Sequence, residues 1–317
     1  MKLVIGNGTV MDKGLPKGFV ITDDNVFKKY GHLIKGDKFV IKSGERSKSI
    51  ENYKKILSKL GNTNTDTLVA FGGGVVGDLA GFVASTYKRG IDFIQIPTTF
   101  LSMVDSSLGG KNGVNLGNKK NYIGTIYQPK EVIIDPLFLE SISKKEFQNG
   151  VSEVIKYGIL FDKQLLHRIS KGVSRKDSDL IKIISRCAKI KLDVVRVDEK
   201  DKGYRHILNF GHTVGHSLEL LYNLSHGEAI SLGMILEMKL GKTRGFFSEE
   251  QIVFLKDILI KNGLLVNLPN INIKKVLEIM KGDKKGEFIF SLSKKDYNVK
   301  FTKREIIKVL ENEQRFN

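Results

Sequence analysis

One carboxylate and three imidazoles with metal-binding chemistry lie in three short polar stretches of the second half of the chain. Glu153 is found in GVSEVIKYGI, His212 in RHILNFGHTVGHSLE and His226 in SHGEAI. Carboxylate and imidazole groups suit a catalytic zinc site that leaves a fourth position for water or substrate. His216 follows His212 by four residues, so on a helix the two rings share one face, and spacing alone nominates both as ligands.

A glycine-rich turn in the first half, FGGGVVGDLAGF, indicates a nucleotide cofactor. Gly72, Gly74 and Gly77 have the G-x-G-x-x-G spacing, after a predicted strand (TLVAF) and at the start of a predicted helix. Glycine there lets the backbone approach a pyrophosphate, which N–H groups at the helix start can bind. A strand-to-helix turn without a ligand is the alternative. Together, a metal and a dinucleotide indicate redox chemistry on a hydroxyl group.

The acidic residue that reads the cofactor ribose is not in its usual place. It is expected at a strand end about 20 residues after the glycines, but Asp92 lies at the start of a predicted strand. Asp23, at the end of an earlier predicted strand, is better positioned. The sequence therefore predicts a dinucleotide fold that departs from the standard Rossmann arrangement.

The segment IPTTFLSMVDSSLGGKNGVNLGNKKNYIG, residues 96–124, is rich in Gly, Ser and Asn and is predicted to be a loop. It contains Asp105, Lys111, Lys120 and Asn121. Lys111 follows two glycines, so its ammonium and nearby N–H groups could bind a phosphate or carboxylate. A solvated loop without function is the alternative, but its place just after the glycine turn favours a site.

The composition is that of a globular protein large enough for two domains, with 317 residues, 41% hydrophobic and 27% charged. The net charge is +17, yet the lysines are spread along the chain without a basic tail. An anionic small substrate therefore explains the charge better than nucleic acid does. Membrane association is not expected, because no apolar run approaches about 18 residues. Cys187 is the single cysteine and the start lacks a signal-peptide pattern, so we expect a cytoplasmic protein.

Short β-branched runs alternate with helical patterns over the first 140 residues. KLVIG, GFVIT, KFVI, TLVAF, DFIQIP and EVIID are predicted strands, which indicates a parallel sheet with helices on both faces. Residues from about 139 to 270 are nearly all helical in pattern, and a hairpin-like segment and a final helix follow. The predicted fold class is α/β plus all-α: a Rossmann-like cofactor-binding domain, 1–140, and a mostly helical metal and substrate domain, 141–317.

The order of these motifs closely resembles the 3-dehydroquinate synthase family of sugar-phosphate cyclases, from about Asp23 to Lys285. The resemblance rests on GGGVVGDLAGFVAS, PTTFLSMVDSSLGGKNGVN, KNYIG, GVSEVIKYGI, DEKDKGYRHILNFGHTVGHSLE and HGEAI. It implies NAD and Zn²⁺ as cofactors, with Co²⁺ as a possible substitute, and a homodimer. It also implies a lyase reaction of the shikimate pathway, from 3-deoxy-D-arabino-heptulosonate 7-phosphate to 3-dehydroquinate and phosphate. Transient oxidation by NAD, phosphate elimination, re-reduction and aldol closure would occur in one site.

The resemblance also assigns residues. It implies that the metal ligands are Glu153, His212 and His226, which leaves His216 to the substrate phosphate. The residues implied for the substrate's hydroxyls and carboxylate are Asp105, Lys156, Lys191, Arg205 and Asn209. Those implied for its phosphate are Lys111, Asn121, His216, Arg89 from the neighbouring subunit, and Lys285 rather than Lys284. Those implied for NAD are Asp23, Asn25, Glu45, Lys48, Gly73, Gly74, Asp78, Thr98, Thr99 and Lys120.

The sequence departs from the family at Asp201, where a glutamate is usual, and its N terminus is short. We expect activity to survive both changes. A cyclase for another sugar phosphate, similar to 2-deoxy-scyllo-inosose synthase, is the main alternative. Arg205, Lys191 and Asn209 together suit a substrate with a carboxylate and favour dehydroquinate synthesis. A metal-dependent polyol dehydrogenase, which would release NADH, and a nucleic-acid-binding protein without activity are the remaining alternatives.

Overall fold

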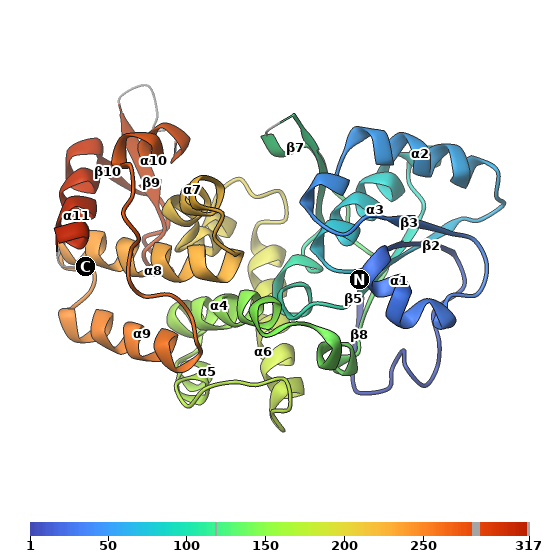
Figure 1. Ribbon diagram of the computed structural model, residues 1–317, viewed down its shortest axis with the longest axis horizontal. Helices are drawn as coiled ribbons and strands as arrows, with labels where there is room; N and C mark the ends of the chain where they lie inside the picture. The colour runs from blue at the N-terminus through green and yellow to red at the C-terminus, as the bar shows by residue number, and fades with distance from the viewer. Residues whose placement is uncertain (118, 281–285, 316–317) are drawn as a thin grey trace. The chain divides into compact units, whose positions relative to one another are not determined.

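The computed structural model describes residues 1–117, 119–280 and 286–315 (Figure 1). The chain divides into two compact units. The first comprises Met1–Phe147 and Arg175–Leu192, and the second comprises Gln148–Ser174 and Asp193–Asn317. Within the described part of the chain, no helix is both long and apolar enough to cross a membrane.

A six-stranded parallel sheet forms the first unit, in the order β1-β8-β5-β4-β2-β3. Its strands are β1 (Lys2–Ile5), β2 (Phe19–Asp23), β3 (Lys38–Ile41), β4 (Thr67–Gly72), β5 (Asp92–Pro97) and β8 (Glu131–Ile134). All six predicted strands are confirmed. Since their order differs from the 3-2-1-4-5-6 of a standard Rossmann sheet, the predicted departure from that arrangement is confirmed too.

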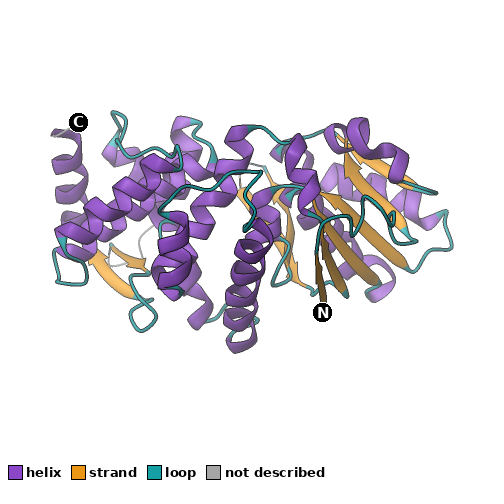
Figure 2. Ribbon diagram, turned by 90° about the horizontal axis from the view of Figure 1, so that it is seen from below, coloured by secondary structure: helices purple, strands orange, loops and turns teal. Residues whose placement is uncertain are grey.

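Helices cover both faces of this sheet (Figure 2). Alternate residues of β4 face opposite sides: Leu68 and Ala70 pack in a core with α2 (Ile50–Gly61) and α3 (Gly74–Thr86). Phe71 contacts Tyr30 of α1 (Asp24–Tyr30) and Phe138, with ring centroids 6.4 and 5.3 Å away. The sheet is therefore buried on both sides, which explains the continuous apolar runs of its strands.

The predicted polar loop, residues 96–124, is instead largely ordered secondary structure, so that prediction was wrong. A π-helical turn, η4 (Ser102–Ser106), precedes an antiparallel hairpin of β6 (Lys111–Leu116) and β7 (Lys119–Ile126). The hairpin forms because Val114 packs in the sheet core. The buried carboxamide of Asn112 donates to the carbonyls of Gly110 and Tyr127.

The second unit is mostly helical, as predicted. Its helices are the later part of α4 (Lys144–Phe161), α5 (Lys163–Ile169), the end of α6 (Leu180–Val197), α7 (His212–Tyr222), α8 (His226–Lys242), α9 (Glu249–Lys261), α10 (Ile273–Met280) and α11 (Lys303–Arg315). The hairpin-like segment is confirmed as the antiparallel pair β9 (Glu287–Phe290) and β10 (Val299–Thr302). Helix α8 is buried along nearly its whole length, so it forms the centre of this unit.

Candidate functional site

The three predicted metal ligands come from three helices of the second unit. Glu153 lies on α4, His212 is the first residue of α7, and His226 is the first residue of α8. One ligand atom from each lies within 4.8 Å of the other two. The Nε2 atoms of His212 and His226 are 3.4 and 3.1 Å from Oε1 of Glu153. The fold therefore brings together residues that are 73 positions apart.

These spacings fit a divalent metal. Two ligands that each lie about 2.0–2.1 Å from a tetrahedral Zn²⁺ are about 3.4 Å from one another. The imidazole–carboxylate distances of 3.4 and 3.1 Å agree with this value. One carboxylate and two imidazoles supply three ligands, which leaves the fourth position for water or substrate, as catalytic zinc sites require.

Hydrogen bonds at the far side of each ring orient the two histidines. Nδ1 of His212 lies 3.1 Å from the carbonyl of Phe210. Because a carbonyl can only accept, Nδ1 donates, and the lone pair of the neutral ring is then on Nε2, toward Glu153. Nδ1 of His226 lies 3.4 Å from Oε2 of Glu219. Such partners fix the tautomer and orientation of metal-binding histidines.

Charge is concentrated in this buried cluster. Burial by itself raises the pKa of Glu153, but the neighbouring Lys156 and His212 outweigh it and hold that pKa well below its usual range. Burial and the Lys156 charge lower the pKa of His212. Burial also disfavours the charged form of His226, yet hydrogen bonds to Glu153 and Glu219 raise its pKa to about 9. Glu153 is thus the anionic group of this cluster, and the neighbouring basic side chains stabilise its charged form.

His216 lies one helical turn after His212 on α7, and the two ring centroids are 5.1 Å apart. The ligand cluster of the described residues contains His212 and not His216. Helical spacing places both rings on one face, but only the first is at the helix start, where it reaches Glu153. The nomination of both histidines by spacing was therefore wrong.

Three more predicted site residues of the second unit are near the metal ligands in sequence. Lys156 pairs with Glu153 and donates from Nζ to the carbonyl of Leu208, 2.9 Å away. Arg205 is only 2% exposed and donates to the carbonyl of Glu199 at 2.9 Å. Asn209 ends the 3-10 helix η6 (Tyr204–Asn209), just before α7. Two of these groups are basic and buried, an arrangement that suits an anionic ligand.

The remaining predicted substrate residues that the structure describes belong to the first unit. Asp105 of η4 and Lys191 of α6 form an ion pair of 2.7 Å. Lys111 begins β6, and Asn121 on β7 has a φ of 51°. Arg89 has a φ of 65° in a turn where Lys88 and Gly90 also have positive φ. Lys284 and Lys285 lie outside the described residues.

The glycine turn has the geometry expected of a pyrophosphate site. Gly73 is the N-cap of α3 and Gly74 its first residue, and no side chain caps this helix. The amide of Thr98 donates to the carbonyl of Gly72 at 3.0 Å, so β5 ends beside the turn. A Cβ on Gly73 would lie 3.0 Å from Cγ2 of Thr99, closer than side chains normally pack. The first N–H groups of this helix, which no side chain caps, therefore suit a pyrophosphate.

Charged side chains gather near the start of α3. Nζ of Lys48 lies 3.0 Å from Oδ2 of Asp78 and 3.1 Å from Oε1 of Glu45. Burial raises the pKa of Asp78 against the opposing effect of Lys48. For Lys48, burial is outweighed by the charges of Asp78 and Glu45, and its pKa is raised. These three predicted cofactor residues therefore form one network.

Asp23 ends β2 and caps α1, accepting from the amides of Asn25 and Val26 at 2.9 and 3.0 Å. Because Thr22 of β2 pairs with Phe71 of β4, this carboxylate is at the same sheet edge as the glycine turn. Lys120 lies on the exposed strand β7.

Two polar residues that the sequence analysis did not identify contact predicted site residues. Glu219 contacts His226, and its position seven residues after His212 places it on the same face of α7, a signal that could have found it. Asn115 donates to Oε1 of Glu45 at 2.9 Å and accepts from the amide of Asn121 at 2.8 Å. Its role depends on the hairpin that was taken for a loop.

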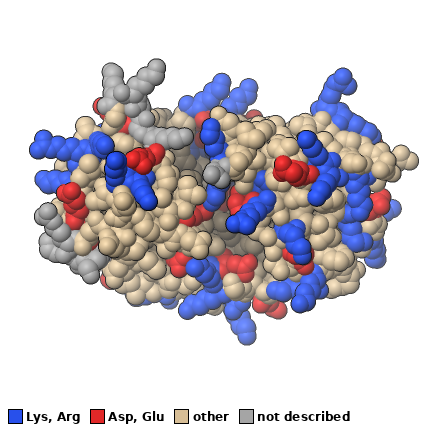
Figure 3. Space-filling view, turned by 45° about the horizontal axis from the view of Figure 1, so that its top comes forward, with Lys and Arg blue, Asp and Glu red and all other residues tan. Residues whose placement is uncertain are grey.

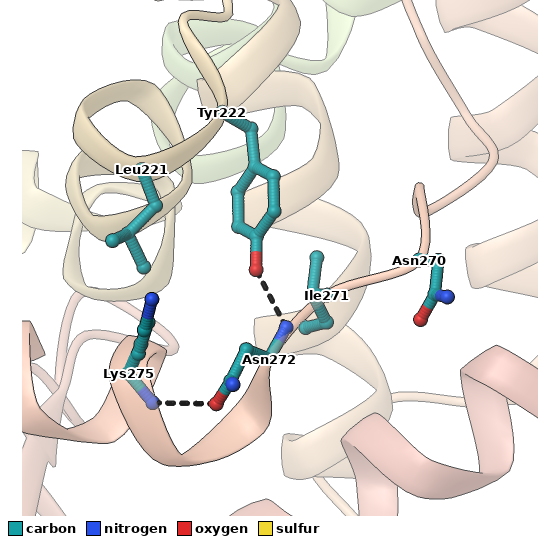
Figure 4. A pocket seen from close by; sticks show the side chains of 6 residues that line it. All are labelled: Leu221, Tyr222, Asn270, Ile271, Asn272 and Lys275. Carbon is teal, nitrogen blue, oxygen red and sulfur yellow. Dashed lines mark hydrogen bonds between the residues drawn. The ribbon is translucent and has the colours of Figure 1, made fainter.

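A shallow pocket of about 470 Å³ lies in the second unit, lined by Leu221, Tyr222, Asn270, Ile271, Asn272 and Lys275 (Figure 4). It sits at the C-terminal end of α7, at Tyr222, whereas His212 is at the start, a separation of about 15 Å along the helix. In the pocket, Tyr222 accepts from the amide of Asn272. The metal-binding chemistry is therefore at the opposite end of this helix.

Basic side chains are scattered over the face of the molecule in Figure 3, with acidic side chains among them. The net charge of +17 is thus not gathered into one stripe on this face.

The fold, a parallel α/β unit followed by a mostly helical unit, is shared with solved structures of other proteins. One solved structure of this fold, 2-epi-5-epi-valiolone synthase from Streptomyces hygroscopicus with NAD+ and Zn²⁺ bound, has a TM-score of 0.84. It is 23% identical, and the match covers 100% of this chain and 97% of that one. A 2-deoxy-scyllo-inosose synthase complex has a TM-score of 0.82 at 24% identity, covering 98% of this chain and 96% of the other.

Sequence comparison is more specific. The patterns of the 3-dehydroquinate synthase N-terminal and C-terminal regions match residues 38–149 and 150–286. The 3-dehydroquinate synthase of Alkaliphilus metalliredigens is 41% identical over 306 residues, which cover 90% of this chain and 86% of the relative. The chain belongs to the 3-dehydroquinate synthase family.

Proposed function

We propose that this protein converts 3-deoxy-D-arabino-heptulosonate 7-phosphate to 3-dehydroquinate and phosphate in the shikimate pathway. The observation that carries the proposal is the Glu153, His212 and His226 cluster in a chain 41% identical to a 3-dehydroquinate synthase. The buried Cys187 is compatible with a reducing cytoplasm, where we place the reaction.

NAD and a divalent metal are the cofactors that these residues would hold. We propose Zn²⁺ at the Glu/His/His cluster, with Co²⁺ as a substitute, and NAD at the glycine turn. When bound, NAD would take up and return the hydride at C5 of the substrate, and the metal would acidify the hydroxyl being oxidised. Gly73, Gly74, Thr98 and Thr99 would contact the pyrophosphate region. Asp23, Asn25, Glu45, Lys48, Asp78 and Lys120 are proposed for the rest of NAD.

Buried basic groups are proposed to hold the substrate. The fork of Arg205 suits a carboxylate, and its backbone contact at Glu199 orients it. Lys156 and Lys191 each pair with a carboxylate, which orients the ammonium group, and each can also donate to substrate hydroxyls. Asp105 and Asn209 complete this set.

A second group is proposed for the phosphate, and it consists of Lys111, Asn121, His216, Lys285 and Arg89 of a second subunit. Cationic and N–H donors stabilise a departing phosphate dianion. Arg89 lies in a turn with three consecutive positive φ angles, at Lys88, Arg89 and Gly90. Such backbone strain is concentrated at functional positions. The homodimer that would bring Arg89 to its partner's site is part of this proposal.

The first test is phosphate release from 3-deoxy-D-arabino-heptulosonate 7-phosphate with catalytic NAD, with and without a chelator. We expect release that the chelator abolishes, no net NADH, and 3-dehydroquinate as product. The alternative is a cyclase for another sugar phosphate, to which the fold likeness to 2-deoxy-scyllo-inosose synthase points. If the folded, zinc- and NAD-supplied protein released no phosphate from this substrate but released it from glucose 6-phosphate, that alternative would replace the proposal.

A further inference from the structure

Glu237 is a fully buried acid in the middle of α8, with 0% of its surface exposed. Its Oε2 accepts from the amide of Gly211 at 2.8 Å, and its Oε1 accepts from the amide of Thr213 at 3.2 Å. The amide of Val214 also contributes a hydrogen bond. Among the described residues, no basic side chain forms an ion pair with it. Its carboxyl group therefore accepts hydrogen bonds from the backbone at the start of α7.

Helix α7 needs such a partner because its N-cap cannot supply one. The first N–H groups of a helix have no partner within the helix, and a cap side chain usually accepts from them. Here the N-cap is Gly211, with a φ of 80° and no side chain. Alanine would not fit, since its Cβ would lie 2.6 Å from Cγ of Met234 on α8. Glu237 thus replaces the missing cap from a neighbouring helix.

The amides that Glu237 binds flank the metal ligand His212. The same turn presents the carbonyl of Phe210, which fixes Nδ1 of His212 and directs Nε2 toward Glu153. Helix α8 also begins with the ligand His226. One helix therefore carries a ligand and, three turns later, the group that holds the backbone of a second ligand.

We propose that Glu237 is a positioning residue of the metal centre, which fixes the start of α7 so that His212 faces Glu153 and the metal. The inference rests on the metal site of the proposed function, but not on the substrate. Removal of an outer partner of a metal ligand typically weakens metal binding about 10- to 100-fold. A loss in this range is expected for Glu237→Gln, whose amide NH₂ cannot accept from a backbone N–H.

The experiment measures the Zn²⁺ dissociation constant of metal-free protein by competition with a chromogenic chelator. Glu313→Gln is the matched control, because Glu313 is also buried and pairs with Lys239 of the same helix, away from α7. We expect the control to bind Zn²⁺ as the unmodified chain does. We also expect the visible spectrum of the Co²⁺ form to change only in Glu237→Gln, and saturating Zn²⁺ to restore its turnover.

Unchanged Zn²⁺ affinity in a folded Glu237→Gln protein, or equal loss in both variants, would overturn the proposal. If Glu237→Gln does not fold, Glu237→Asp retains the carboxyl group and shortens its reach by one methylene. Weaker Zn²⁺ binding is still expected there, and unchanged binding would refute the role. Because the Zn²⁺ affinity and the Co²⁺ spectrum are measured without substrate, a wrong assignment of the reaction would leave these two results intact.

Discussion

Glu153 and Lys156 are predicted to contribute unequally to stability, although they form one buried ion pair. Glu153 is 0% and Lys156 1% exposed. Replacing Glu153 by Leu leaves the Lys156 ammonium beside two imidazoles, and the Leu208 carbonyl is then its only hydrogen-bond acceptor among the described residues. Removal of one partner from a buried pair typically costs about 3–5 kcal/mol. Replacing Lys156 by Met leaves Glu153 with His212 and His226 as hydrogen-bond partners.

The expected loss for Lys156→Met is therefore smaller, about 1.5–3 kcal/mol, the value of a hydrogen bond to a charged group. The double variant should be more stable than Glu153→Leu alone, because it no longer contains the unpaired ammonium. Unfolding of the metal-free proteins in urea is the assay. It should be followed by circular dichroism, because the chain has no tryptophan.

The reasoning fails if Glu153→Leu destabilises the metal-free protein no more than Lys156→Met does. It also fails if the two single effects add in the double variant, since additivity would mean that the pair is not coupled. Both results would show that the cluster is solvated when the metal is absent.

Three further outcomes follow from the packing and the charges. Gly81→Ala should destabilise the protein by about 1–3 kcal/mol, because the added Cβ would lie 1.9 Å from Oδ1 of Asn112. Gly61→Ala should not, because nothing lies within 4 Å of a Cβ at that position. Unfolding in urea tests both variants. The free energy of unfolding should fall as pH rises from about 4.5 to about 8. Burial raises the pKa of Glu237 to about 8, so in this pH range the side chain ionises in the unfolded chain but not in the folded one. A Glu237→Gln protein whose free energy of unfolding falls equally steeply with pH would contradict this. Asn115→Ala should weaken NAD binding in calorimetry, because it removes one of the two polar contacts of the Glu45 carboxylate and leaves only its ion pair with Lys48. Unchanged affinity would show that the network does not reach the cofactor.

The elements of this fold were predictable where one local pattern decided them. Each strand of the parallel sheet is a short apolar run bounded by turn residues, since both faces are covered. The hairpin of residues 111–126 was missed because β7 is mostly exposed and polar, and only Val114 and Ile123 pack against the core. The pairing of β6 with β7 depends on tertiary contacts, which cannot be read from the composition of the segment.

The ligands themselves could be named from their motifs, but the geometry around them could not. Spacing along α7 nominated His216, and only the tertiary placement of Glu153 and His226 selects His212. Glu237 gave no signal at all, because an acid in an amphipathic helix is normally solvated. Its function arises only when α7 and α8 pack side by side.

Backbone strain marks predicted site residues that side-chain chemistry alone would leave ambiguous. Arg89, Asn121 and Asp201 have φ angles of 65°, 51° and 56°, a region that non-glycine residues rarely adopt. Each such residue costs on the order of 1 kcal/mol or more and persists only where the surroundings require it. Asp201, which stands where the resemblance implies a glutamate, therefore lies at a strained backbone position, and its side chain is shorter by one methylene.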